Sequence, residues 1–130
     1  MTLVLVVPAL LVACSQTPRA TTPAALSFVA SRTASPGLSE RKDGRAEAVG
    51  YVTWIGVEGG FWALRDRASQ LVTDHPRIVV VLAPGSVSEK SIAAFEGDYV
   101  IVSGKVRTGA STRMSGPELV VGGIVPARHP

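Results

Sequence analysis

The sequence predicts a mainly β domain of five strands, with one short helix between the third and the fourth. The first supporting observation is the stretch 47–66, which holds both tryptophans and has a Gly-Gly pair between two runs of β-branched and aromatic residues, the pattern of a β-hairpin. The second is the capping-box spacing of Ser86 and Glu89, which indicates the start of a helix. The third is a composition of 46% hydrophobic and 18% charged residues, which is typical of a small globular body and excludes a disordered chain.

The predicted elements follow one another without long interruptions. The strands are predicted at residues 47–57, 61–66, 77–83, 99–107 and 118–126. The helix is predicted from Ser86 to about Glu96, with Ile92 and Phe95 facing the core and Gly97 ending it. Gly104 interrupts the fourth strand, and we expect a bulge or sharp bend there.

Two short motifs resemble a known fold family, in addition to the order of the elements. The run at 95–106, FEGDYVIVSGKV, looks like the junction between the helix and the fourth strand of OB-fold domains. The run at 58–62, EGGFW, resembles the first hairpin of small bacterial OB-like proteins. The resemblance covers residues 47–126 and implies a five-stranded OB-like Greek-key barrel within a domain at 45–130. Both motifs concern the fold, so they imply no functional residue.

The N-terminus has the pattern of a lipoprotein signal peptide over residues 1–13. An apolar run at 3–12 is too short to span a bilayer, and the four residues Leu11-Val12-Ala13-Cys14 resemble the lipobox of bacterial lipoproteins. The resemblance implies a lipid on Cys14, the only cysteine. Met1 and Thr2 lack the positive charge that usually begins a signal peptide, so a start of translation upstream of Met1 stays open. The alternative is an ordinary buried strand, with Cys14 as a small core residue.

Residues 14–44 are rich in Ser, Thr, Pro and Ala and are predicted to be the lipidated N-terminus and a flexible linker. The basic cluster Arg41, Lys42 and Arg45 is interpreted as a solvated linker end, with contact to anionic lipid head groups as the alternative. The predicted location is a lipid anchor in the cell membrane or the outer membrane, with the domain facing the periplasm or the cell exterior. Ser15 resembles the pattern of outer-membrane sorting, but the choice between the two membranes stays open.

Candidate ligand-binding residues come from the face on which OB domains usually bind. The second and third strands and the adjoining loops offer Trp62, Arg65, Arg77, Arg107 and Arg113. An aromatic ring with nearby cations can stack on and neutralise single-stranded nucleic acid. However, the chain from residue 45 onward has nine Lys or Arg against eight Asp or Glu, so its net charge is only +1. We therefore expect Trp54 and Trp62 to be packing residues.

Catalytic and metal-binding patterns are weak in this sequence. His75 lies in a turn, His129 is the penultimate residue, and no nucleophile elbow accompanies them. With one cysteine and no spaced histidine pair, no zinc site is predicted around Asp74 and His75. The two glycine pairs lie in a hairpin turn and in a strand, so no phosphate loop is predicted. No enzyme activity, cofactor, metal or catalytic residue is expected.

The sequence thus favours a membrane-tethered extracytoplasmic binding or interaction module of the cell envelope, with an envelope protein or a glycan as its partner. The alternative is an OB-fold binder of single-stranded nucleic acid or another polyanion, and a hydrolase is the least favoured. Oligomeric state and ligand stay open.

Overall fold

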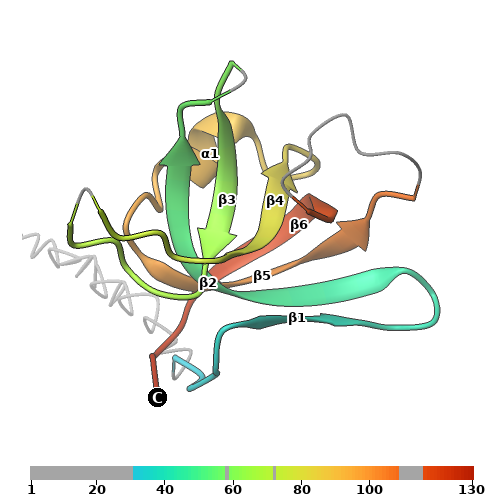
Figure 1. The fold of residues 1–130 in the computed structure, drawn as a ribbon. Coiled ribbons are helices and arrows are strands. Elements are labelled where there is room, and N and C mark those ends of the chain that lie inside the picture. Colours follow the sequence, from blue (N-terminus) through green and yellow to red (C-terminus); the bar gives the residue numbers. More distant parts are fainter. Residues whose placement is uncertain (1–30, 58, 72, 109–115) are drawn as a thin grey trace, which may run out of the picture.

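The computed structural model describes residues 31–57, 59–71, 73–108 and 116–130 of the chain (Figure 1). The predicted signal peptide, Cys14 and most of the predicted linker lie outside these residues. The described strands are β1 (Gly37–Glu40), β2 (Arg45–Ile55), β3 (Phe61–Arg65), β4 (Ile78–Ala83), β5 (Tyr99–Val106) and β6 (Glu118–Pro126). The described helix is α1 (Glu89–Ala93).

The six strands belong to one mixed sheet in the order β1-β2-β3-β4-β6-β5. The pair β4–β6 is parallel, and the other pairs are antiparallel. The long strand β2 also pairs with β5, so the hydrogen-bonded pairings lead from β2 through β3, β4, β6 and β5 back to β2. Along β2, residues 45–51 pair with β5 and residues 51–55 pair with β3.

The prediction of a mainly β domain is confirmed, but the strand count needs correction, and with it the numbers of the strands that flank the helix. A sixth strand, β1, occupies Gly37–Glu40, which the sequence analysis assigned to the linker. Its backbone pairs with residues 46–49 of β2, and Leu38 packs against the core. Because of β1, the helix lies between β4 and β5, and the described residues between β3 and β4 contain no helix.

The helix itself is shorter than predicted and begins at a different cap. Ser88, rather than Ser86, is the N-cap residue, and its Oγ accepts a hydrogen bond from the backbone N–H of Ser91 at 3.2 Å. Helix α1 ends at Ala93, and the turns that follow reach Gly97, whose φ of 85° suits glycine. The predicted core-facing residues are confirmed, since Ile92 is fully buried and Phe95 packs against the same cluster.

The core lies mainly on one face of the strands. Its buried aliphatic side chains come from all five strands β2–β6 and from α1, and include Val52, Leu64, Ile92, Val102 and Leu119. On the other face, Phe61, Ala63 and Val81 form a second buried cluster over β3 and β4. Every described strand except β1 therefore contributes fully buried hydrophobic side chains, and β1 contributes the partly buried Leu38.

A third cluster joins the two ends of the described chain beside β5. The hydroxyl of Tyr99 donates a hydrogen bond to the carbonyl oxygen of Ala34 at 2.5 Å, and the backbone of Thr33 forms a parallel bridge with Arg128. The rings of Tyr51 and Tyr99 lie 4.8 Å apart, with His129 beside both. We call this group, Thr33, Ala34, Tyr51, Tyr99, Arg128 and His129, the terminal clasp.

Candidate functional site

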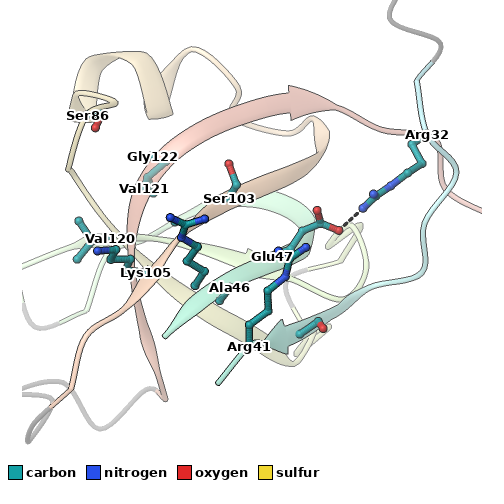
Figure 2. Close-up of a pocket in the computed structure, with 13 residues that line it drawn as sticks. Arg32, Arg41, Ala46, Glu47, Ser86, Ser103, Lys105, Val120, Val121 and Gly122 are labelled. Atoms are coloured by element: carbon teal, nitrogen blue, oxygen red, sulfur yellow. Dashed lines mark hydrogen bonds and ion pairs between the residues drawn. The ribbon is translucent and has the colours of Figure 1, made fainter. Parts of the chain in front are cut away.

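A groove of about 650 Å³ lies beside the β1–β2 hairpin, between β1, the start of β2 and the strands β5 and β6 (Figure 2). The β1–β2 turn closes through a hydrogen bond from the Gly44 N–H to the Arg41 carbonyl oxygen at 3.0 Å. In Figure 2, Glu47 and Ser103 lie near the middle of the lining residues, Arg41 lies below them and points toward Glu47, and Arg32 and Ser86 lie at opposite sides. The hairpin thus brings the predicted linker end into contact with the sheet.

Positive charge dominates the groove. Its lining includes four cationic side chains, Arg32, Arg41, Arg45 and Lys105, against the single carboxylate of Glu47, which gives a formal charge of +3. Arg32 forms an ion pair with Glu47, and the Nε of Arg45 lies 3.5 Å from a carboxylate oxygen of Asp43. Arg41 and Lys105 have no ion-pair partner among the described residues. These two side chains are available to an anionic group.

Hydroxyl groups and a close backbone approach complete the groove. Ser39, Ser86 and Ser103 line it, and their hydroxyls have no hydrogen-bond partner in the described part of the chain. The predicted bulge is confirmed at Ser103/Gly104, where the register of β5 against β6 shifts. A Cβ at Gly104 would collide with the carbonyl oxygen of Val120, so only glycine lets β6 approach here. The groove can donate both charged and neutral hydrogen bonds to oxygen atoms of a ligand.

The arginines predicted from sequence do not gather into one site. Arg77 lies next to Asp66, with 3.8 Å between Nε and a carboxylate oxygen, and Arg107 lies 3.0 Å from Glu118. Arg65 is half-buried in β3, and its Nε is buried without a hydrogen-bond partner. Arg113 lies outside the described residues. The groove contains none of the described candidates.

The two tryptophans have different environments. Trp62 is 9% exposed and belongs to the main core cluster, which confirms the expectation that it packs. Trp54 lies directly opposite it on β2, but its side chain is 42% exposed. On β3, Trp62 points to the main core, whereas its neighbours Phe61 and Ala63 belong with Val81 to the buried cluster on the other face.

Part of the groove can be found in the sequence, because two of its cations belong to the basic cluster at residues 41–45. Arg41 and Arg45 were noticed as a basic cluster but assigned to a solvated linker end; Lys42 does not line the groove. Lys105 and Ser103 were missed, because only the β2–β5 register places Lys105 opposite Arg45 and Ser103 opposite Glu47. The sequence does contain a signal for the hairpin, because charged residues lie on both sides of Gly44. Gly44 has a φ of 77° in the turn.

Comparisons with known proteins give no family for this chain. No protein-family model, no curated protein and no solved structure matches it. In the described part of the chain, no group of three or more His, Cys, Asp or Glu side chains is placed to hold a metal ion. Among the same residues, no helix has the length and the apolar character needed to cross a membrane.

Proposed function

We propose that this chain is a membrane-tethered binding module of the cell envelope, without enzyme activity, that holds an anionic group of its partner in the cationic groove. The groove is the observation that carries the proposal. It combines a formal charge of +3, two cations free of described ion pairs and three hydroxyls without described partners. Phosphate and carboxylate groups are the ligands that such a donor set favours.

We infer that the strands β2–β6 make up the OB-like Greek-key barrel of the resemblance, with β1 added at its outside. The continuous pairing from β2 around to β5 and back supports this inference, as does helix α1, which contributes Ile92 to the core. Under this proposal the groove lies at one end of the barrel, away from the sheet face that OB domains commonly use.

Single-stranded nucleic acid is a less suitable ligand for the groove. Binding of single strands combines positive charge with aromatic side chains on which bases stack. The groove lining contains no aromatic residue, and the exposed Trp54 lies in a separate hollow. We therefore favour a phosphate- or carboxylate-bearing envelope component, either a soluble polyanion or a lipid head group.

Titration of the full chain with inorganic polyphosphate, and with vesicles containing phosphatidylglycerol, tests the groove and separates these two sources. Lys105→Gln should weaken binding and lower the slope of log affinity against log salt by about one unit. Arg41→Gln should act in the same way. Lys90→Gln is the matched control, because Lys90 is an exposed lysine outside the groove with no described ion pair.

Equal losses in Lys105→Gln and Lys90→Gln would show that binding depends on net charge, and would reject the groove as the site. Binding to vesicles alone would assign the ligand to a lipid head group, whereas binding to polyphosphate alone would assign it to a soluble polyanion. Absence of binding to both would reject the proposed function.

The tether has its own test, independent of the groove. Cells that produce the chain are grown with labelled palmitate, and the label should appear on the protein and disappear in Cys14→Ala. Label that persists in Cys14→Ala would contradict lipidation at Cys14.

A further inference from the structure

A second hollow, of about 500 Å³, lies where the end of β2 and the start of β3 meet helix α1. We call it the tryptophan pocket. Its lining residues are Trp54, Trp62, Glu89, Lys90, Ala93 and Glu96. It shares no residue with the cationic groove, and its chemistry is different.

The indole ring of Trp54 lines the pocket and is held in place by its protein neighbours. Trp54 and Trp62 are register partners on β2 and β3, with ring centroids 5.0 Å apart and planes inclined by 58°. Trp62 is anchored in the core, so Trp54 rests on a buried aromatic neighbour. The indole N–H of Trp54 has no hydrogen-bond partner among the described residues.

The turn between β2 and β3 supports the same ring from another side. Gly60 has a φ of 84°, and a Cβ at this position would collide with the six-membered ring of Trp54. The backbone of Gly60 thus lies against the indole. Among the described residues, the other exposed large apolar side chains are Val57 and Leu71, which lie outside the strands, and Val125 in β6, so Trp54 is the exposed aromatic one. A ring ordered before binding loses little conformational entropy when a ligand stacks on it.

The charged side chains around the ring lack partners of their own. Glu89 and Lys90 come from α1, and Glu96 comes from the turns after it. In the described part of the chain, none of the three forms a side-chain hydrogen bond or an ion pair. The pocket therefore offers two carboxylate acceptors, an ammonium donor and an indole N–H donor around an aromatic surface.

We propose that the tryptophan pocket binds a pyranose ring of a glycan. One face of a pyranose presents C–H groups that pack on an aromatic ring, while its hydroxyls around the edge both donate and accept hydrogen bonds. Hydroxyl donors suit Glu89 and Glu96, and hydroxyl acceptors suit Lys90 and the indole N–H of Trp54. A sugar uses the aromatic surface and both kinds of polar group together.

Other ligand classes leave part of the pocket unsatisfied. A phosphate-bearing ligand would be repelled by the two carboxylates. A quaternary ammonium would be attracted by the carboxylates and the rings, but it has no hydrogen-bond donor for the carboxylates and no acceptor for Lys90 or the indole N–H. A wholly apolar ligand would cover three charged side chains without pairing them, which is unfavourable. A neutral polyhydroxylated ring meets none of these penalties.

Calorimetric titration of the full chain with cellotetraose, N-acetylchitotetraose and mannotetraose tests the proposal. At least one of the three should bind saturably and change the tryptophan emission. Trp54→Ala should weaken that binding by about tenfold or more, since truncated tryptophans are frequent hot spots. Leu71→Ala is the matched control, because it removes a strongly exposed apolar side chain that does not line the pocket, and should leave affinity unchanged.

Two further measurements separate loss of the site from loss of the fold. Trp54→Phe keeps an aromatic ring and should retain part of the affinity, and Glu96→Gln should weaken binding without changing the thermal unfolding midpoint. The proposal is overturned if none of the three tetrasaccharides binds, if Trp54→Ala binds as tightly as the parent, or if tetramethylammonium displaces the sugar. The groove is tested with anionic probes and the variant Lys105→Gln, and the pocket with neutral sugars and Trp54 variants. Either proposal can therefore fail while the other stands.

Discussion

The two ends of β2 present opposite kinds of surface. At its start, the cationic groove combines arginine and lysine side chains with serine hydroxyls, small residues and no aromatic ring. At its end, the tryptophan pocket has two indole rings surrounded by charges of both signs. In Figure 1 the β1–β2 hairpin lies at lower right, whereas α1 lies at the top beside β2 and β3. One strand thus supports two hollows that differ in electrostatics and in apolar content.

The difference teaches how each hollow depends on the fold. The pocket is continuous with the core, because Trp62 lines the pocket and also belongs to the main core cluster. The groove is built largely from exposed side chains on a hairpin, and its cations contribute little to packing. Substitution of Trp62 should therefore affect stability and binding together, whereas substitution of the groove cations should affect binding alone.

Trp62→Ala should have the largest effect on stability. Removal of a buried tryptophan leaves a cavity and is expected to lower the free energy of unfolding by roughly 3–5 kcal/mol. Urea unfolding of Trp62→Ala and of Lys105→Ala would measure the contrast, because Lys105 lies on β5 opposite Arg45, at the start of β2. A loss in Trp62→Ala no larger than that in Lys105→Ala would contradict the assignment of Trp62 to the core.

Gly60→Ala should have the next largest effect, with Gly59→Ala as its matched control. Both glycines have positive φ, 84° at Gly60 and 85° at Gly59, so both variants carry backbone strain of about 1–3 kcal/mol. Only at Gly60 would the added Cβ collide with Trp54, since nothing lies within 4 Å of a Cβ at Gly59. Gly60→Ala should therefore unfold at lower urea and show altered tryptophan emission. Identical behaviour of the two variants would contradict the support of Trp54 by Gly60.

Tyr99→Phe tests the terminal clasp, which is part of neither hollow. Loss of the hydrogen bond to Ala34 should lower the free energy of unfolding by about 1 kcal/mol. In the parent protein, burial, and secondarily the neighbouring Tyr51, raises the pKa of Tyr99 above its usual 10.0. The folded state then holds the Tyr99 proton more tightly than the unfolded state does. The stability that comes from this difference is fully present below pH 10 and is lost as pH rises through the folded pKa.

The free energy of unfolding should be measured against pH in both proteins. The parent should lose stability above pH 10 through Tyr99, and Tyr99→Phe should lack this loss. A decline of the same size in both proteins would assign it to groups other than Tyr99.

Asp43→Asn should have the smallest effect on stability and should sharpen the electrostatic side of the comparison. It removes an exposed ion pair with Arg45, so the free energy of unfolding should change by less than about 1 kcal/mol. It also removes a carboxylate next to a groove cation, so polyphosphate should bind more tightly. Asp74→Asn, which breaks the ion pair with Arg67 outside the groove, should leave that affinity unchanged. Tighter binding in both variants would indicate a net-charge effect.

Much of the fold was predictable because its signals are local. The glycine-containing hairpin, the β-branched run before Ala83, the glycine at the β5 bulge and the strand ending at Pro126 all mark their own elements. Strand β1 was missed because its four residues contribute only Leu38 to the main core cluster, too short a pattern to distinguish from a linker. The helix cap was misplaced because Ser86 and Ser88 are both serines shortly before Glu89.

The site was less predictable because it depends on strand pairing. Lys105 and Arg45 lie 60 positions apart in the chain and meet only through the β2–β5 register. The described arginines of the predicted site do not gather in one hollow, and the fold places Asp66 beside Arg77 and Glu118 beside Arg107. Trp54 was expected to pack, but the position that it takes at the end of β2 leaves part of its ring in solvent.

The terminal clasp has a mechanical consequence for a domain held by the proposed lipid anchor. Tension along the chain before residue 31 would reach the Thr33–Arg128 bridge and the Tyr99–Ala34 hydrogen bond before it reached β1. Backbone hydrogen bonds join Ala34 to Arg128 at 3.2 Å and Arg128 to Arg32 at 3.1 Å, so this load would be shared by several bonds at once. The clasp would shield the groove-forming hairpin from forces that act on the anchor.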